Sequence, residues 1–296
     1  MTPSGSIPVL FARGRSLPEA YENALLTLYE DGCRIRTQYD KKDADGAFID
    51  PPSIDATMMI VVEEPNSEPR FSRCFPGGPE DLQEYRMEVV DGVKDHWVDH
   101  RDKKKWQYTY HERLTAYDIV GGPGGSGLRR NQIDAVVEQL AKTPYSRRIQ
   151  AITWQPWIDQ DCDDPPCLQR LWFRILEDDA GIWRLNMNVD FRSRDAFKAS
   201  FMNMDVFIYW MTIIAERVSK RAGRQVLLGR YCDTSASFHI YGKDLEEFSK
   251  LFLWNYFHRS FDDRTYTTED LAQMMAEAVP AILAKIKAKD EGDRDA

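Results

Sequence analysis

The sequence predicts an α+β fold, because its helical and strand-like segments come in separate runs rather than in a regular alternation. Three strand-like segments follow one another in the middle of the chain, at 149–154, 170–177 and 182–190. A mostly apolar stretch, roughly 199–222, predicts one long helix that is buried on several sides. No linker, charge block or repeat divides the 296 residues. We therefore expect a single domain over 1–296, with residues 1–15 and 288–296 frayed.

The first part of the chain predicts a helix, a strand and a second helix. Ser16-Leu-Pro-Glu19 has the pattern of a capping box, and Gly32 is the expected helix stop. The β-branched run 57–64 predicts a strand, and a helical stretch follows around 79–93. The Gly-rich segment 121–127 lacks the Lys-Ser/Thr of a phosphate loop, so we expect a flexible connector there.

The later elements show clearer periodicity. Residues 131–142 have apolar residues on one helical face. Residues 182–190 alternate strictly between apolar and polar side chains, which predicts a strand with one face in the core and the other lining a polar cleft. The long helix is followed by an expected strand pair, 225–232 and 237–241, and by helices near 244–258 and 268–288.

Composition limits the class of partner. The net charge of -9 and the pI near 5.2 argue against a nucleic-acid groove, so an anionic substrate would need a local basic pocket. Five cysteines, an odd number, and the lack of any apolar run near membrane-spanning length predict a reduced, cytoplasmic, soluble protein. There is no Cys-x-x-Cys motif and no ligand-like pairing of histidines with cysteines, so we expect no metal site.

Cys167 is the candidate nucleophile. It follows two prolines and precedes a predicted strand, and arginines are frequent nearby, in 146–148, at Arg170 and in 191–195. A thiol reacts as a thiolate, which cationic neighbours favour. A lone cysteine at the mouth of a strand is nevertheless more often a small buried apolar residue. The assignment therefore depends on the pattern around it.

Several spaced fragments supply that pattern. They are Ser-Arg-Arg after a helix (146–148), Pro-Pro-Cys ending at Cys167, Phe-Arg-Ser-Arg-Asp (191–195), Asn203 eleven residues after Arg192, and Phe-His-Ile-Tyr (238–241). In this order, across about 84–243, they resemble the thymidylate synthase superfamily. The resemblance implies a three-layer fold with a mixed sheet and a long buried helix, in a homodimer that packs sheet to sheet and shares its sites.

The resemblance also implies the chemistry. Cys167 would add to C6 of a pyrimidine nucleotide, so that C5 can accept a one-carbon unit from 5,10-methylenetetrahydrofolate. Arg192 would lie beside both the thiolate and the phosphate, and would lower the pKa of the thiol. Ser193 would add a hydroxyl to the phosphate site. Arg147 and Arg148 would reach the phosphate bound by the neighbouring subunit.

Other matched positions would recognise the base, the sugar and the folate. Asn203 falls at the base-reading position, where a carboxamide can pair with N3–H and O4 of uracil, so the resemblance points to dUMP. Asp205 lies two residues on, and a carboxylate at this position would favour cytosine. His239 and Tyr241 would hold the ribose hydroxyl, and Asp195 would contact the folate pterin.

Proton transfer would need further groups. Glu84 falls on a helix where the family has a catalytic glutamate, and Glu88 lies one turn further on. Tyr110 matches a tyrosine that assists removal of the C5 proton. Two pairs of candidates stay open: Trp97 or Trp106 against the folate, and Arg34 or Arg36 against the phosphate.

The chain departs from thymidylate synthases proper at several places. Leu168 replaces a histidine, Phe191 replaces a glutamine, and a charged C-terminus replaces the apolar tail that closes over the folate. After one-carbon transfer, the exocyclic methylene of the nucleotide is either reduced by hydride or hydrated by water, and reduction needs water excluded. These departures favour hydration to 5-hydroxymethyl-dUMP, by a deoxyuridylate hydroxymethylase. The alternatives are a thymidylate synthase making dTMP, a dCMP or CMP hydroxymethylase, and a catalytically silent nucleotide- or RNA-binding relative.

Overall fold

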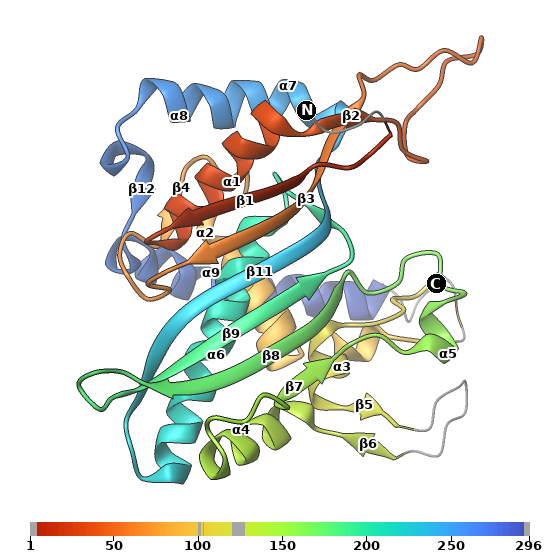
Figure 1. Ribbon diagram of the computed structural model, residues 1–296. Coiled ribbons are helices and arrows are strands. Elements are labelled where there is room, and N and C mark those ends of the chain that lie inside the picture. The colour runs from red at the N-terminus through yellow and green to blue at the C-terminus, as the bar shows by residue number, and fades with distance from the viewer. Residues whose placement is uncertain (1–4, 100–101, 103, 120–127, 293–296) are drawn as a thin grey trace.

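A mixed sheet forms the centre of the computed structural model, which describes residues 5–99, 102, 104–119 and 128–292 (Figure 1). Parallel pairs (β1 with β3, β9 with β11) stand beside antiparallel ones (β3 with β11, β8 with β9, β7 with β8). This mixture confirms the α+β prediction. The main strands lie in the order β1 (Val9–Gly14), β3 (Ser53–Val62), β11 (Val226–Ile240), β9 (Trp183–Phe191), β8 (Leu168–Glu177) and β7 (Gln150–Ile152), while β2 (Cys33–Ile35) pairs with β3 and β10 (Arg194–Asp195) with β11.

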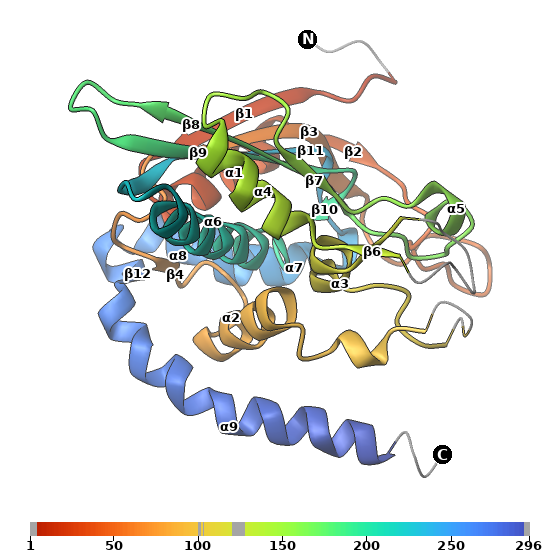
Figure 2. The same ribbon diagram turned by 90° about the horizontal axis from the view of Figure 1, so that it is seen from below.

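Helices cover one face of this sheet in two layers (Figure 2). The inner layer contains α6 (Ser200–Ala222), α1 (Leu17–Asp31) and α4 (Gln132–Lys142), and the outer layer contains α2 (Pro79–Arg86) and α9 (Thr268–Gly292). None of the helices in the described part of the chain is both long and apolar enough to cross a membrane. The shorter elements are α3 (Tyr110–Thr115), α5 (Pro156–Asp159), α7 (Leu245–Phe248), α8 (Trp254–His258) and the small ladders of β4 (Phe71–Ser72) with β12 (Thr265–Tyr266) and β5 (Tyr117–Asp118) with β6 (Arg129–Arg130).

Helix α6 is the buried helix that the apolar stretch predicts. Its aromatic residues Phe201 and Phe207 are fully buried, and Trp210 is nearly so. The indole N–H of Trp210 donates to the Val89 carbonyl. Because α6 contacts the sheet on one side and α2 on the other, apolar residues occupy most of its circumference.

Strand β11 differs from the expected strand pair. The segment between the two predicted strands stays extended, and the ladder with β3 only shifts register between Ser235 and Phe238. Asp233, which falls between the two expected strands, is fully buried and accepts hydrogen bonds from Arg194 at 2.9 and 2.6 Å. A buried ion pair thus allows a carboxylate inside a central strand, which periodicity alone cannot reveal.

The chain ends are more ordered than expected. Residues 9–14 form β1, which pairs with six residues of β3, and residues 288–292 continue α9. The expectation of fraying at 1–15 and 288–296 is therefore wrong for these parts. Residues 1–4, 293–296 and the Gly-rich connector 121–127 lie outside the described residues.

Helix α1 has the predicted limits, from the N-cap Ser16 to the C-cap Gly32. The predicted capping box does not form, because the Glu19 carboxylate accepts from the backbone N–H of Arg15 at 2.7 Å instead of that of Ser16. The Ser16 hydroxyl is buried and has no hydrogen-bond partner among the described residues. A single hydrogen bond to the Glu19 carboxylate thus stabilises the start of the helix, from a backbone N–H one residue earlier than the pattern suggests.

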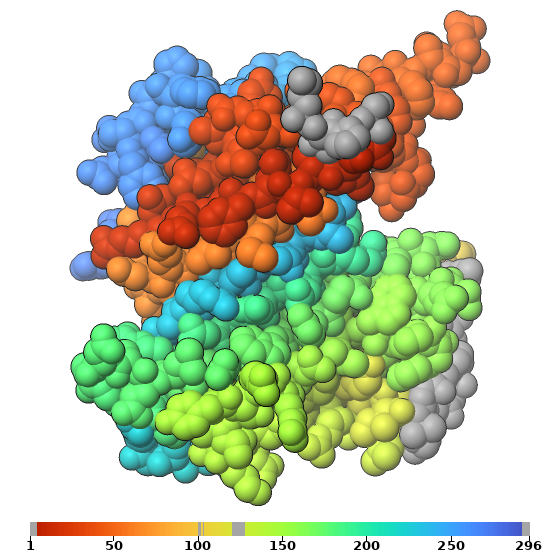
Figure 3. All heavy atoms as spheres, in the orientation of Figure 1, coloured from red at the N-terminus to blue at the C-terminus, as the bar shows by residue number. Residues whose placement is uncertain are grey.

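Within the described part of the chain, no helix covers the other face of the sheet, and its strands lie at the surface in Figure 3. The alternation in β9 is confirmed, but its polar side faces this open surface rather than a cleft. Asp190 accepts from Arg170 of the neighbouring strand at 2.8 Å. Val9, Phe11 and Met59 of β1 and β3 are exposed apolar residues on the same surface.

Candidate active site

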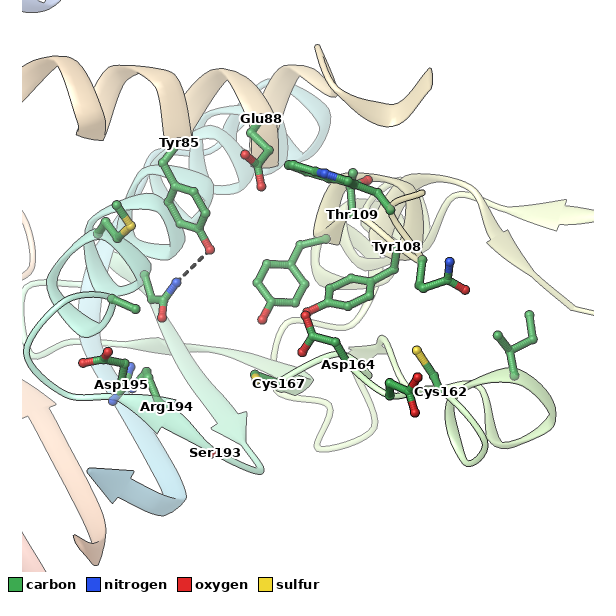
Figure 4. A pocket seen from close by; sticks show the side chains of 18 of the residues that line it. Tyr85, Glu88, Tyr108, Thr109, Cys162, Asp164, Cys167, Ser193, Arg194 and Asp195 are labelled. Carbon is green, nitrogen blue, oxygen red and sulfur yellow. Dashed lines mark hydrogen bonds between the residues drawn. The ribbon is translucent and has the colours of Figure 1, made fainter. Parts of the chain in front are cut away.

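A cavity of about 810 Å³ lies near β10 and the end of β11, between α2, the first turn of α6 and the loop before β8 (Figure 4). It brings together side chains that are far apart in the sequence. Seven of the predicted site residues line it: Tyr110, Cys167, Ser193, Asp195, Asn203, His239 and Tyr241.

Cys167 lies directly before β8, with the Arg192 backbone N–H donating to its carbonyl at 2.9 Å. The Arg192 guanidinium donates to the carbonyls of Pro165 at 2.5 Å and Pro166 at 3.0 Å. Burial raises the pKa of the Cys167 thiol, Arg192 opposes this effect, and Asp164 adds to it. The expected activation by Arg192 is therefore too small to overcome burial, and the thiol needs a proton acceptor when it attacks.

The two charged neighbours should change the reactivity of Cys167 in opposite directions. Only the thiolate is alkylated, so at neutral pH a lower thiol pKa means faster reaction. We expect Asp164→Asn to speed alkylation by iodoacetamide and Arg192→Gln to slow it, each by roughly threefold to tenfold. Peptide-resolved mass spectrometry gives the rate, with the remote Cys33 as an internal control. A slower reaction in Asp164→Asn would show that its charge does not act on the thiol.

Two polar residues on α6, Asn203 and Asp205, have different surroundings. Asn203 is only 6% exposed, lines the cavity, and donates from Nδ2 to the Tyr85 hydroxyl at 2.7 Å. Asp205 does not line this cavity and forms two hydrogen bonds of 2.7 Å with Arg86. Arg70 lies 3.6 Å from the same carboxylate. The carboxamide, and not the carboxylate, is thus available to a ligand.

His239 and Tyr241 form a neutral polar pair on the cavity wall, with ring centroids 4.6 Å apart. Nδ1 of His239 lies 3.1 Å from the Ser237 hydroxyl, which donates to the Asp55 carboxylate. Burial lowers the pKa of His239 and raises that of Tyr241 to about 12. Nε2 of His239 has no partner among the described residues. A ligand hydroxyl that bonded it would remove the cost of an unsatisfied buried group.

Asp195 both holds the turn before α6 and lines the cavity. Its Oδ1 accepts from the backbone N–H groups of Phe197 at 3.0 Å and Lys198 at 2.8 Å, which fixes the carboxyl at the start of the turn into α6. Burial raises the pKa of Asp195 to about 6. It therefore lines the cavity as a carboxylate at neutral pH and can accept hydrogen bonds from an N–H donor of a ligand.

The structure replaces Glu84 by Glu88 as the glutamate of the site. Glu84 does not line the cavity, and its carboxylate bonds Lys94 at 2.8 Å and Lys285 at 2.9 Å. Glu88 lines the cavity beside Tyr85 (Figure 4), and burial raises its pKa. After α2 the chain continues as a π-helical turn, Met87–Asp91, which changes which side chains face inward. That irregularity has no signal in the sequence.

Three tyrosines surround the thiol side of the cavity. The Tyr110 hydroxyl accepts from the backbone N–H of Leu168 at 3.2 Å, and the Tyr108 ring lies 5.6 Å from that of Tyr110. Tyr85 completes the group. Burial raises the pKa of all three, so they are neutral phenols. Sequence reasoning missed Tyr85 and Tyr108, although the spacing of Tyr108 and Tyr110 could have marked the second.

The remaining candidates are divided between the cavity and the surface. Arg147 and Arg148 are exposed between α4 and β7 and do not line the cavity of their own chain, and neither Arg34 nor Arg36 lines it. Trp106 lines the cavity. Trp97 packs edge-on against it, with the two ring centroids 5.2 Å apart. Among the described residues, no group of three or more histidine, cysteine or acidic side chains could hold a metal.

Comparisons with known proteins agree with this arrangement. Residues 79–258, more than half of the chain, match the family model for thymidylate synthase. Two archaeal relatives are described as "Putative thymidylate synthase". The one from Methanocaldococcus jannaschii is 27% identical over 80% of this chain and 93% of its own length, and the one from Methanopyrus kandleri is 31% identical over 80% and 96%.

A solved structure shares the fold. The thermostable thymidylate synthase A from Bacillus subtilis superposes with a TM-score of 0.57 at 16% identity, covering 80% of this chain and 84% of that chain. At this identity the likeness supports the architecture alone. With the match to the family model over 79–258, it shows that the chain belongs to the thymidylate synthase family.

Proposed function

We propose that this protein transfers a one-carbon unit from 5,10-methylenetetrahydrofolate to C5 of dUMP. The observation that carries the proposal is the convergence of a thiol, a carboxamide and a buried carboxylate on one cavity, from Cys167, Asn203 and Glu88. The thiol supplies a nucleophile, the carboxamide can recognise uracil, and the carboxylate can move protons. The proposed reaction uses all three of these groups.

The reaction would proceed through a covalent adduct. The Cys167 thiol gives its proton to water in the cavity, the sulfur forms a bond to C6, and the electron pair of the C5–C6 double bond moves to C5 and O4. C5 then attacks the methylene carbon of the folate iminium. Loss of the C5 proton, assisted by Tyr110, and departure of tetrahydrofolate leave an exocyclic methylene on the nucleotide. Glu88 would order water and manage the proton at O4, the role that the sequence had suggested for Glu84.

Hydration would complete the reaction and give 5-hydroxymethyl-dUMP. Hydroxide adds to the exocyclic methylene, and the Cys167 thiolate leaves C6. Of the described residues, none after Tyr241 lines the cavity, and the exposed Asp161 and Asp163 form part of its wall. Water can therefore reach this side of the site, which favours hydration over hydride transfer. The second candidate is dTMP synthesis, which the descriptions of the two archaeal relatives favour.

A homodimer would complete the phosphate site. Arg192 and Ser193 would hold the phosphate from one chain, and Arg147 and Arg148 of the other chain would add two cations. The open sheet face, with exposed Val9, Phe11 and Met59, offers a self-complementary surface for this pairing. All five cysteines are unpaired, which suits a reducing compartment, and we propose the cytoplasm.

The product distinguishes the two outcomes. Incubation with dUMP and 5,10-methylenetetrahydrofolate should give a nucleotide whose mass has increased by a hydroxymethyl group, with no dihydrofolate absorbance. A methyl product with one dihydrofolate per turnover would instead establish dTMP synthesis. Parallel reactions with dCMP, CMP and UMP control for the base and the sugar. No product from any of the four nucleotides, with nucleotide binding intact, would refute the enzymatic proposal.

A further inference from the structure

Helix α9 lies outside the region 79–258 that matches the family, yet it is firmly docked. Ile282 and Ile286 pack with Met87 in a small apolar cluster, while Leu271 and Met275 join the main core. These four residues are spaced by four, seven and four positions, which places them along one side of the helix. The C-terminal segment is therefore a fixed outer layer over α2.

An ion-pair chain connects α9 to the cavity. Lys285 of α9 lies 2.9 Å from Glu84, and Glu84 accepts a hydrogen bond from Lys94 at 2.8 Å. Lys94 also donates to Glu88 at 2.8 Å. Lys94 is only 7% exposed, whereas the Lys285 side chain is largely exposed. The alternating charges thus run from the surface to the carboxylate that lines the cavity.

A second set of contacts connects α9 to the aromatic wall. The Lys289 ammonium lies 3.9 Å from the centre of the Trp97 ring, close enough for a cation–π contact. Asp290 accepts from the Trp97 indole N–H at 2.6 Å. Trp97 in turn packs against Trp106, which lines the cavity. The last described turns of α9 therefore support this wall from behind.

We propose that α9 is a positioning element of the reaction centre, acting on Glu88 through Lys94 and on Trp106 through Trp97. The inference rests on the proposed function, because it assumes that Glu88 and Trp106 serve a reaction in this cavity. Lys94, Lys285 and Lys289 are then positioning residues that touch no substrate. Lys285 and Lys289 belong to α9, which lies outside the region that matches the family.

Lys94 sets the charge around Glu88. Burial raises the pKa of Glu88, Lys94 lowers it, and the carboxylates of Glu84 and Asp95 raise it further. The neutral phenol of Tyr85 is the other ionisable group of α2 near this carboxyl. Without Lys94, only effects that favour the protonated form remain. The limb of a pH–rate profile that reports Glu88 must then move to higher pH, whichever protonation state is active.

The variant series separates positioning from general stability. We expect Lys94→Met to reduce kcat/KM by about tenfold or more and to move that limb to higher pH. Lys94→Arg should restore most of the profile. Lys285→Met should move the limb in the same direction by less, because it acts through Glu84. The control is Lys287→Met on the same helix, whose only described ion pair is an exposed one with Glu291 at 3.8 Å.

The aromatic arm has its own readout. Lys289→Ala should raise the KM for the folate about threefold or more while leaving the KM for the nucleotide unchanged, because the cation–π contacts with Trp97 at 3.9 Å and Trp106 at 5.5 Å are lost. Equal changes in both KM values would instead indicate a general loss of structure, and no change would overturn this half of the inference.

A titration without turnover keeps this inference apart from the proposed function. NMR of protein labelled with 13C at the glutamate carboxyl, assigned with Glu88→Gln, follows the Glu88 carboxyl directly. The inference is supported if the pKa of Glu88 is higher in Lys94→Met than in the wild type and is unchanged in Lys287→Met. This result would support it even if the wild type makes no product from dUMP. An unchanged titration in Lys94→Met overturns the inference even if the wild type is active.

Discussion

Cys167→Ala is expected to abolish turnover while leaving nucleotide binding within about threefold. The sulfur supplies the electron pair that activates C5, and Cys167 lines the cavity next to Pro166, whose carbonyl accepts from the Arg192 guanidinium. Loss of a covalent nucleophile typically lowers kcat by at least about 10³-fold. Nucleotide affinity depends on other groups, so it should survive. Steady-state kinetics and calorimetric titration with dUMP measure the two quantities separately.

Cys162→Ala is the matched control, because Cys162 also lines the cavity but lies in the acidic loop before the two prolines. It should keep kcat within about threefold of the wild-type value. Mass spectrometry of the wild type with a 5-fluorinated dUMP and the folate adds a second test, since the adduct should map to the peptide that contains Cys167. Residual activity in Cys167→Ala above about one tenth of the wild-type rate would eliminate the covalent mechanism.

The sequence could predict those cavity residues that belong to recognisable fragments. Cys167, Asn203 and His239 were identified because their fragments, in order and spacing, resemble the thymidylate synthase superfamily, and the structure brings all three to one cavity. Cys167 lies directly before β8 and Asn203 lies in the first turn of α6, so a characteristic spacing in the sequence corresponds to a definite place in the fold.

What the sequence could not predict depends on local irregularity and on burial. Glu88 belongs to the π-helical turn after α2 and lines the cavity, whereas Glu84 belongs to α2 and does not, although both fit the same helical pattern in the sequence. The pKa of Cys167 depends on how much protein surrounds the thiol, and an arginine count cannot supply that. Strand β11 continues through Asp233, between the two expected strands, and the Arg194 that pairs with this buried carboxylate is 39 positions away in the sequence.

Asn203→Asp is expected to reverse the base preference from dUMP to dCMP. One N–H of the Asn203 amide is used by Tyr85, so the second N–H and Oδ1 remain for O4 and N3–H of uracil. A carboxylate would face O4 with a second acceptor and would instead accept from the amino group of cytosine. Sites that recognise a polar edge reject the wrong edge strongly, so the ratio of kcat/KM values should change by about 10²-fold or more.

Asp205→Asn tests whether this effect belongs to the residue in the cavity. Asp205 lies outside the cavity and balances Arg86 and Arg70, so its loss leaves two largely buried cations without a full counter-charge. We expect a free energy of unfolding lower by about 3 kcal/mol in urea titration, with base preference unchanged. A change of preference in Asp205→Asn, or none in Asn203→Asp, would mean that the carboxamide does not read the base. A reversed preference in Asn203→Asp together with an unchanged preference in Asp205→Asn would assign dUMP recognition to one side chain on the first turn of α6, which bonds the Tyr85 hydroxyl.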